Sequence, residues 1–492
     1  MSAAGVLAII AGYYLLLTLV ARLTSGSKDN NAFFQGNRQS PWWAVCFGMV
    51  GASISGVSFV SVPGMVSTSA MTYLQMCLGF VFGYILVACI LLPLYYRLGL
   101  ITIYTYLKQR FGMHSYRTGA LFFFLSKLAG ASIRLYLVCM ILQQFVFDEL
   151  GLPFTVSVAA VVLLIWFYTR QSGIRTIVWS DCLQTTVLLA ALGMIIWQVC
   201  SGLMLSFQDI PATIAASPMS RIFDFDGFVR PTNFFKQFVS GIFVVVVMTG
   251  LDQDMMQKNL TCRTLRQSQL NMCVNGLLYF PINLLLLSLG VLLYMYSEQI
   301  GMQLPSSGDK LLPLLCGEGH LGYAAMVCFT IGITAAAFSS ADSAMTSLTT
   351  CFCVDIMQRE KDERLRKLVH PMVAAAMIGV IVLVGTVQQA SIISVVYMVC
   401  GYTYGPLLGL FAFGMTTRRK PREWMVPFIC LASPLCCYLA DTLAQSMWQY
   451  KFGYELLLMN GALTYVLLLL SSAKLGTDDS RGNADVQALG RD

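Results

Sequence analysis

Apolar runs of about 20 residues or more follow one another along almost the whole chain, separated by short polar stretches. A helix needs about that many apolar residues to cross the hydrocarbon core of a membrane. The pattern therefore predicts an all-α polytopic membrane protein with about thirteen transmembrane helices, in a single transmembrane domain over residues 1–475. The predicted spans are 4–23, 42–66, 71–96, 118–147, 153–169, 176–203, 236–257, 268–297, 319–353, 368–388, 390–415, 424–445 and 453–473.

The composition excludes a soluble globular chain, because 57% of the residues are hydrophobic and only 11% are charged. The three histidines, His114, His320 and His370, lie near span ends and form no H-E-x-x-H pattern. No nucleophile elbow occurs either. We therefore do not expect an enzyme.

Most of the 31 Lys and Arg residues fall on one side of the predicted spans, for example Arg170, Arg175, Lys258 and Arg263. Basic residues stay in the cytoplasm, so we expect the N-terminus outside a cell (inner or plasma) membrane and residues 476–492 as a short polar cytoplasmic tail. The net charge of +7 follows from this topology, and no nucleic-acid partner is expected.

Two blocks of five spans, about 42–203 and about 236–415, have similar hydropathy. Each opens with an interrupted helix, at Gly51–Gly56 in the first block and at Thr249–Asp252 in the second. Unwound backbone survives in a membrane only beside a water-filled cavity or a ligand. The pattern predicts an inverted repeat with a transport site, including Thr249, between the two interruptions.

Hydroxyl side chains and carboxylates within the spans indicate a cation site. Asp342 lies on one face of span 319–353 together with serine and threonine residues, and Asp181 lies in span 176–203. A carboxylate at that depth costs about 2.5–3.5 kcal/mol, so a partner or an ion is expected. Neutral hydroxyls and carbonyls with one or two carboxylates suit Na⁺, with proton coupling as the open alternative.

Two cations, Lys127 and Arg134, share one face of span 118–147. A buried guanidinium favours a bidentate carboxylate partner. That partner is either the carboxylate of a substrate or a carboxylate of the protein, Asp342 or Asp181, and both alternatives stay open here. The two cations favour an anionic solute.

Several stretches in a specific order resemble the sodium/solute symporter family along nearly the whole chain. They are Phe33–Arg38 with Pro41–Trp43, Thr105–Gly112, Gly173–Gln184, Asp252–Gln257 and the serine-rich stretch 335–347. The resemblance implies the leucine-transporter-like architecture of an inverted five-plus-five repeat, with one extra N-terminal and two extra C-terminal helices. It also implies Na⁺ as the co-transported ion.

The resemblance places the main sodium site on the backbone carbonyls of Gly51, Ile54 and Ala336 and the hydroxyls of Ser339 and Ser340. A second cation site, described for some family members, maps to Asp181, Ser339, Asp342 and Ser343. The family members with that second site resemble one another in a serine pattern in this stretch, whereas this chain has Asp at 342.

The segment Ile54–Pro63 resembles the sialic-acid-transporting branch, with Ser55 and Ser58 at the matching substrate positions. The arginine of that branch aligns with Gly130, one turn before Arg134. Its glutamine aligns with Cys77, with Gln75 two residues away. The expected substrate contacts are Ser55, Ser58, Tyr73, Gln75, Arg134 and Thr249.

We therefore predict a sodium-coupled symporter that imports a small organic solute by alternating access. The solute is expected to be anionic, such as a sialic acid or another carboxylate. The alternatives are a sodium/sugar or sodium/amino-acid symporter of the same family, or a transporter-like solute sensor. The lipid bilayer is the other expected partner, and the pattern does not specify an oligomeric state.

Overall fold

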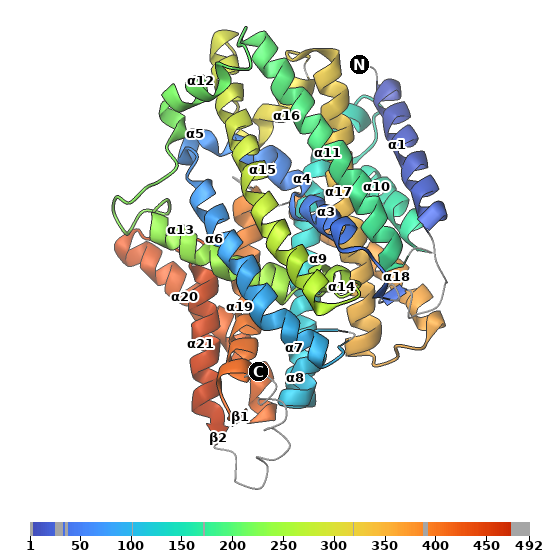
Figure 1. The fold of residues 1–492 in the computed structure, drawn as a ribbon, viewed down its shortest axis with the longest axis vertical. Helices are drawn as coiled ribbons and strands as arrows, with labels where there is room; N and C mark the ends of the chain where they lie inside the picture. The colour runs from blue at the N-terminus through green and yellow to red at the C-terminus, as the bar shows by residue number, and fades with distance from the viewer. Residues whose placement is uncertain are drawn as a thin grey trace.

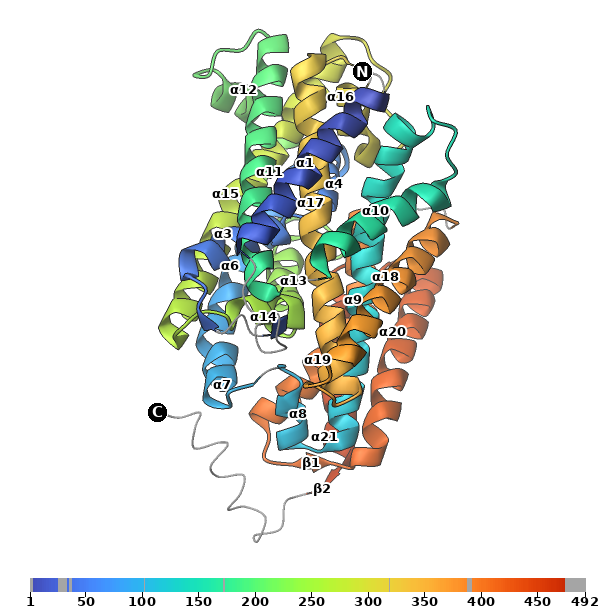
Figure 2. The same ribbon diagram turned by 90° about the vertical axis from the view of Figure 1, so that its right-hand side faces the viewer.

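The computed structural model describes residues 3–24, 33–34, 38–100, 102–170, 173–317, 319–386 and 392–473, and these are almost entirely helical (Figure 1). Among them, two short strands, β1 (Lys420–Pro421) and β2 (Ser472–Ala473), pair antiparallel. The predicted tail 476–492 lies outside the described residues. The described chain begins at one end of the long axis and finishes near the other, as Figures 1 and 2 both show.

Nine helices of the described ranges are long and apolar enough to cross a membrane. They are α1 (Ala3–Thr24), the continuous run Tyr73–Arg97 that contains α6 (Tyr73–Leu86) and α7 (Leu92–Arg97), α9 (Met113–Leu142, continued to Phe147), α11 (Ile174–Gly202), α15 (Leu265–Gln299), α17 (Gly322–Cys351, continued to Ile356), α18 (Glu363–Gly385), α19 (Ile392–Thr416) and α20 (Val426–Trp448). Each coincides with a predicted span.

Two further spans are bent pairs of helices. The helix α3 (Trp42–Ser53) meets α4 (Gly56–Gly64) at 53°, and the run Phe234–Gly250, which begins with α13 (Phe234–Val245), meets α14 (Gln253–Asn259) at 69°. Counting each pair as one span raises the number to at most eleven. These bends lie where the sequence predicts interrupted helices.

At two predicted spans the helix is too short to cross the hydrocarbon core without tilt or extension. The helices α10 (Phe154–Thr169) and α21 (Leu456–Ser471) have 16 residues each. At 1.5 Å per residue such a helix is about 24 Å long, against about 30 Å for the hydrocarbon core. The predicted count of thirteen crossings is therefore not confirmed, although a helix lies at every predicted position.

Short helices join the spans. They are α5 (Val66–Ser69), α8 (Thr105–Arg110), α12 (Ile210–Ala216) and α16 (Leu311–Gly317). The segment with α12 stands at the same end of the molecule as the start of α1, and α8 at the end where β1 and β2 pair (Figures 1 and 2).

The first bend follows from the backbone at Ile54 and Ser55. The last helical hydrogen bond of α3 runs from the Ile54 amide to the Val50 carbonyl at 3.1 Å, and Ile54 then leaves the helical region with φ −89° and ψ 82°. Ser55 is extended and starts α4. Because the last carbonyls of a helix have no intrahelical partner, the end of α3 presents free carbonyl oxygens inside the protein.

At the second bend a side chain caps the helix that follows. The Asp252 carboxylate accepts hydrogen bonds from the amides of Asp254 at 2.8 Å and Met255 at 3.3 Å, and so caps α14. Aspartate is a favoured residue at this position, since it satisfies amides that the first turn leaves unpaired.

Glycines let α3 pack closely on α11. A Cβ at Gly48 would stand 2.9 Å from the Asp181 Cβ, and one at Gly51 would stand 1.9 Å from the Thr185 Oγ1. The helix α11 in turn packs along α17, next to it in Figure 2. The end of α3, the middle of α11 and the middle of α17 thus meet in one buried region.

Candidate functional site

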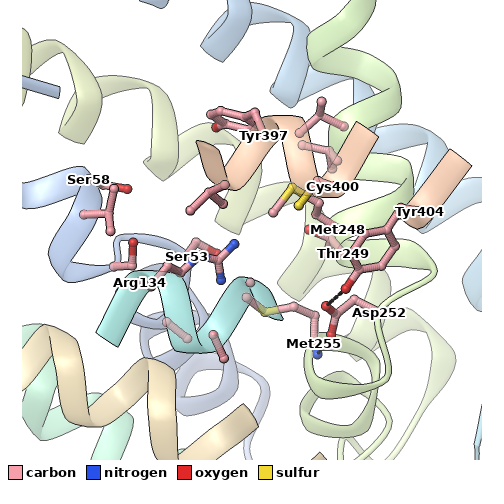
Figure 3. Close-up of a pocket in the computed structure, with 18 of the residues that line it drawn as sticks. Ser53, Ser58, Arg134, Met248, Thr249, Asp252, Met255, Tyr397, Cys400 and Tyr404 are labelled. Carbon is pink, nitrogen blue, oxygen red and sulfur yellow. Dashed lines mark hydrogen bonds between the residues drawn. The ribbon is translucent and has the colours of Figure 1, made fainter. Parts of the chain in front are cut away.

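A cavity of about 90 Å³ opens between the two bends. Its walls come from α3 and α4 on one side, from Met248, Thr249 and Asp252 at the second bend on another, and from α9 and α19 (Figure 3).

Four of the six residues expected to contact substrate line this cavity. They are Ser55, Ser58, Arg134 and Thr249. Figure 3 places Ser58 and Thr249 on different sides of the space, with Arg134 between them. The structure also adds Ser53 and Tyr397 to the same lining.

The structure does not bring Tyr73 or Gln75 into the lining. The Tyr73 hydroxyl lies behind it, 2.9 Å from the hydroxyl of Tyr397. The fully buried Gln75 amide donates to the Thr232 carbonyl at 2.9 Å and accepts from the Asp224 amide at 2.9 Å. Its hydrogen bonds thus hold the segment before α13, and its role toward substrate stays a prediction.

The two cations of α9 have different surroundings. The Lys127 ammonium pairs with Asp252 at 3.1 Å and Asp254 at 2.7 Å. The Tyr404 hydroxyl donates to the same Asp252 carboxylate at 2.8 Å. Within the described residues no carboxylate lies within ion-pair distance of the Arg134 guanidinium, which borders the cavity.

The carboxylates considered as partners of Arg134 are engaged elsewhere. Asp181 accepts a hydrogen bond from the Ser339 hydroxyl at 2.6 Å and pairs with the Lys258 ammonium at 2.8 Å. Asp342 accepts hydrogen bonds from the Tyr168 hydroxyl and from the Ser343 amide. Neither carboxylate neutralises Arg134.

The residues expected to form the main sodium site converge on the first bend and α17. Gly51 and Ile54 belong to the end of α3, where carbonyls are free. A Cβ at Gly56 would lie 3.9 Å from the Ala336 Cβ, so the bend rests against α17. The buried Ser340 Oγ has no hydrogen-bond partner among the described residues.

The second expected cation site is assembled only in part. Asp181 and Ser339 meet, whereas Asp342 and Ser343 bond to each other, with a Ser343 hydroxyl to Asp342 carboxylate distance of 3.2 Å. The place beside Asp181 contains the Lys258 ammonium.

Lys258, which the sequence analysis counted among the basic residues on the cytoplasmic side of the spans, is buried within the protein, with only 1% of its side chain exposed. Asp252 and Asp254 were not assigned a charge-pairing role from the sequence. The sequence does contain a signal for Asp254. It lies four residues before Lys258 at the end of an apolar span, and this spacing favours an ion pair within a helix.

Comparison with known proteins gives a consistent result. Residues 33–423 match the family model described as the sodium:solute symporter family. The chain is similar to the sodium/sialic acid symporter SiaT of Proteus mirabilis, with 25% identity over 443 residues that cover 84% of each chain. It is also similar to the human sodium/iodide cotransporter, with 26% identity over 409 residues, 79% of this chain and 62% of that protein.

Solved structures show the same fold. A sodium-coupled sialic acid symporter, in a substrate-bound outward-open state, superposes with a TM-score of 0.82 at 20% identity over 96% of this chain and 99% of that chain. Mhp1, a nucleobase-cation-symport-1 family transporter, gives a TM-score of 0.58 at 13% identity over 94% and 99%.

These neighbours have the leucine-transporter-like fold, so the predicted fold class is confirmed. They are transporters rather than enzymes, as the sequence analysis expected. With a family match over most of its length and a cavity between two broken helices, this chain belongs to the sodium:solute symporter family.

Proposed function

We propose that this sodium-coupled symporter imports a small solute with a carboxylate group, which binds the Arg134 guanidinium in the cavity between the two bends. The observation that carries the proposal is the difference between the two cations of α9. Lys127 has two carboxylate partners, whereas Arg134 faces the cavity without one among the described residues. A guanidinium binds a carboxylate through two parallel hydrogen bonds.

The remaining lining suits a hydroxylated anion. Ser53, Ser55, Ser58 and Thr249 supply hydroxyl groups, and Tyr397 supplies an aromatic face. By their names, relatives of this chain transport sialic acid, iodide or monocarboxylates with sodium. All three are anions, which supports an anionic solute here and makes sialic acid one candidate.

The arginine of this site lies at a different position along α9 from the arginine expected for the sialic-acid branch. A Cβ at Gly130, where the arginine of that branch aligns, would meet nothing within 4 Å. Arg134 stands one helical turn away, about 5–6 Å along the axis. The carboxylate of the solute is therefore proposed to lie about one turn further along α9, with the vacated space available to the rest of the solute.

Sodium is proposed to bind at the first bend, with the carbonyls of Gly51, Ile54 and Ala336 and the hydroxyls of Ser339 and Ser340. The unpartnered Ser340 Oγ supports this assignment, because buried hydroxyls are nearly always hydrogen-bonded or bind a ligand. Sodium occupancy would order the bend that also carries Ser55 and Ser58, so ion and solute would raise each other's affinity.

We also propose an orientation with the N-terminus outside a cell membrane and the tail in the cytoplasm, and two inverted blocks at about 42–203 and 236–415. The skewed distribution of Lys and Arg supports the orientation. Accessibility of single introduced cysteines at Ser206 and Arg418 to an impermeant thiol reagent, in a background without accessible native cysteines, would test it. Labelling from outside is expected at 206 and not at 418.

Uptake by proteoliposomes tests the function. Sialic acid, a monocarboxylate, iodide, a neutral sugar and an amino acid are offered with and without an inward sodium gradient. We expect sodium-driven uptake of a carboxylate and none of the neutral sugar. Sodium-dependent binding without uptake would instead indicate a sensor, and uptake of the neutral sugar would contradict the proposal.

Arg134→Gln is the decisive variant. Loss of charged hydrogen bonds worth about 1.5–3 kcal/mol should raise the half-saturating solute concentration by about 10- to 150-fold. Stabilisation by Na⁺ alone should be unchanged, because Arg134 is not proposed as a sodium ligand. Arg134→Lys, which keeps the charge but loses the planar fork, should give an intermediate loss. Unchanged uptake by Arg134→Gln would refute the substrate assignment.

A further inference from the structure

The carboxylate of Asp181 is completely enclosed, and its charge must be compensated inside the protein. The side chain is 0% exposed. On one side α3 packs so closely that a Cβ at Gly48 would stand 2.9 Å from the Asp181 Cβ. One oxygen accepts the Ser339 hydroxyl at 2.6 Å, and the other faces the Lys258 ammonium at 2.8 Å. An uncompensated charge at this depth would be strongly destabilising.

The compensating cation belongs to the chain itself. Lys258 lies in the last turn of α14, immediately after the second bend, and its side chain is 1% exposed. Besides Asp181 at 2.8 Å it has Asp254 at 3.8 Å. Its ammonium therefore lies between two carboxylates, and oxygen ligands of this kind are those that a monovalent cation takes.

The other carboxylate of the expected second site does not contribute to it. The oxygens of Asp342 accept the Tyr168 hydroxyl and the Ser343 amide, and the Ser343 hydroxyl lies 3.2 Å from the same carboxylate. Only Asp181 and Ser339 converge, and the other oxygen of Asp181 pairs with Lys258.

We propose that the ammonium of Lys258 permanently takes the place of a second sodium ion, so that the transporter binds one Na⁺ per chain. The inference rests on the proposed sodium symport and assigns its stoichiometry. Lysine and Na⁺ carry the same single positive charge, and one such charge balances Asp181. At about 4 Å from the ammonium, a further monovalent cation would bind on the order of a thousandfold more weakly.

The main sodium site remains available in this arrangement. Ser339 donates its hydrogen to Asp181, which leaves its oxygen lone pairs for a cation at the first bend. Ser340 has no partner among the described residues and is not part of the Lys258 cluster. One exchangeable ion and one fixed ammonium can therefore share the Ser339 side chain.

The test counts Na⁺ on the purified full-length chain, with NaCl as the only probe and choline chloride holding the ionic strength constant. We expect radioactive sodium binding to saturate at one ion per wild-type chain with a Hill coefficient near 1. Lys258→Met should expose Asp181 and add a second ion, with a Hill coefficient above 1. Lys258→Arg, which keeps the charge, should stay at one.

The double variant Lys258→Met with Asp181→Asn removes both charges and should return the count to one, and it remains usable if Lys258→Met alone does not fold. Two ions on the wild-type chain would overturn the proposal. So would a folded Lys258→Met chain that still binds one ion, because the lysine would then be a structural ion pair only. A failure of the proposed symport is distinguishable, since in that case the wild-type chain would bind no Na⁺ at all.

Discussion

The two bent spans border the same cavity, but they are built from different chemistry. The first bend, at Ile54 and Ser55, carries free backbone carbonyls and serine hydroxyls and has no charged side chain within it. The second bend, at Leu251 and Asp252, carries the Asp252 carboxylate and is followed by Asp254 and Lys258, and these three charges are paired inside the protein.

Neutral dipoles and full charges suit different tasks. A carrier must bind its ion firmly enough to select it and weakly enough to release it, which carbonyl and hydroxyl oxygens allow. A buried ion pair is difficult to separate, because removing either partner leaves an uncompensated charge inside the protein. We infer that the first bend binds the co-transported ion, whereas the paired charges at the second bend form a fixed scaffold that binds no exchangeable ion.

The largest effect is expected from removing the α9 cation that pairs with the carboxylates of the second bend. Lys127→Met leaves Asp252 and Asp254 without their nearest cation and should cost about 3–5 kcal/mol of stability, measured by thermal unfolding in detergent. Adding Asp252→Asn should recover much of the loss. Lys367→Met, which breaks an exposed pair with Glu363, should cost less than about 0.5 kcal/mol. Similar losses for both lysines would contradict the fixed-scaffold interpretation.

At the first bend the sensitive property is close packing rather than charge. Gly51→Ala places a Cβ 1.9 Å from the Thr185 Oγ1 and should cost about 1–3 kcal/mol while weakening Na⁺ binding, because α3 must move away from α11. Thr185→Ala in the same chain should restore part of both properties. Gly193→Ala, on the open face of α11, should be tolerated. Unaltered Na⁺ affinity in Gly51→Ala would separate this bend from the ion site.

A smaller effect is expected from a single ligand. Ser340→Ala should raise the half-saturating Na⁺ concentration by about fivefold, the equivalent of one lost interaction of about 1 kcal/mol. Ser347→Ala is the control on the same helix, since that hydroxyl already bonds to the Ala344 carbonyl at 3.0 Å. If the two variants have equal sodium dependence in liposomes, the ion does not bind Ser340.

The smallest effect concerns the segment that leads into the second bent span. A hydrogen bond from the Thr232 hydroxyl at 2.5 Å holds the pKa of the Asp224 carboxyl below its usual value, helped by Arg221 at 2.9 Å. The stabilisation is then complete above about pH 4, the pKa of an unfolded aspartate, and is lost as the pH falls through the lower native pKa.

Asp224→Asn should therefore lower stability by less than about 1 kcal/mol at pH 7, and the difference from wild type should shrink as the pH falls through the lowered native pKa. Asp226→Asn, whose side chain is 76% exposed, is the control and should change the stability at pH 7 by less than Asp224→Asn in the same melting measurements. If the difference in stability persists in acid, the stabilisation comes from the packing and hydrogen bonds of the Asp224 side chain rather than from its charge.

The helices and both interruptions could be predicted from the sequence because their signals are local. The length of the apolar runs determines where the spans lie. Glycine, proline and serine near residues 51–64 weaken a helix whatever its tertiary contacts. The structure narrows the interruptions to Ile54–Ser55 and Leu251–Asp252.

The charge pairing could not be predicted in the same way, because it joins residues far apart in the chain. Lys258 lies one residue beyond the predicted end of its span, and its partner Asp181 belongs to another block. Hydropathy alone cannot distinguish a lysine at the membrane surface from one buried against a carboxylate. Arg134 and Lys127 likewise share a helix face, and only the fold shows which of them is neutralised.

The ammonium of Lys258 also bears on how the membrane voltage acts on transport. If one Na⁺ crosses with one carboxylate, the translocated charges cancel and the cycle is electroneutral. A second sodium would instead add one net charge, worth about 2.3 kcal/mol for every 100 mV. With the fixed lysine, accumulation is driven by the sodium concentration gradient alone. A potassium diffusion potential imposed with valinomycin should then leave the final accumulation unchanged, so that the cell retains this import when its membrane depolarises.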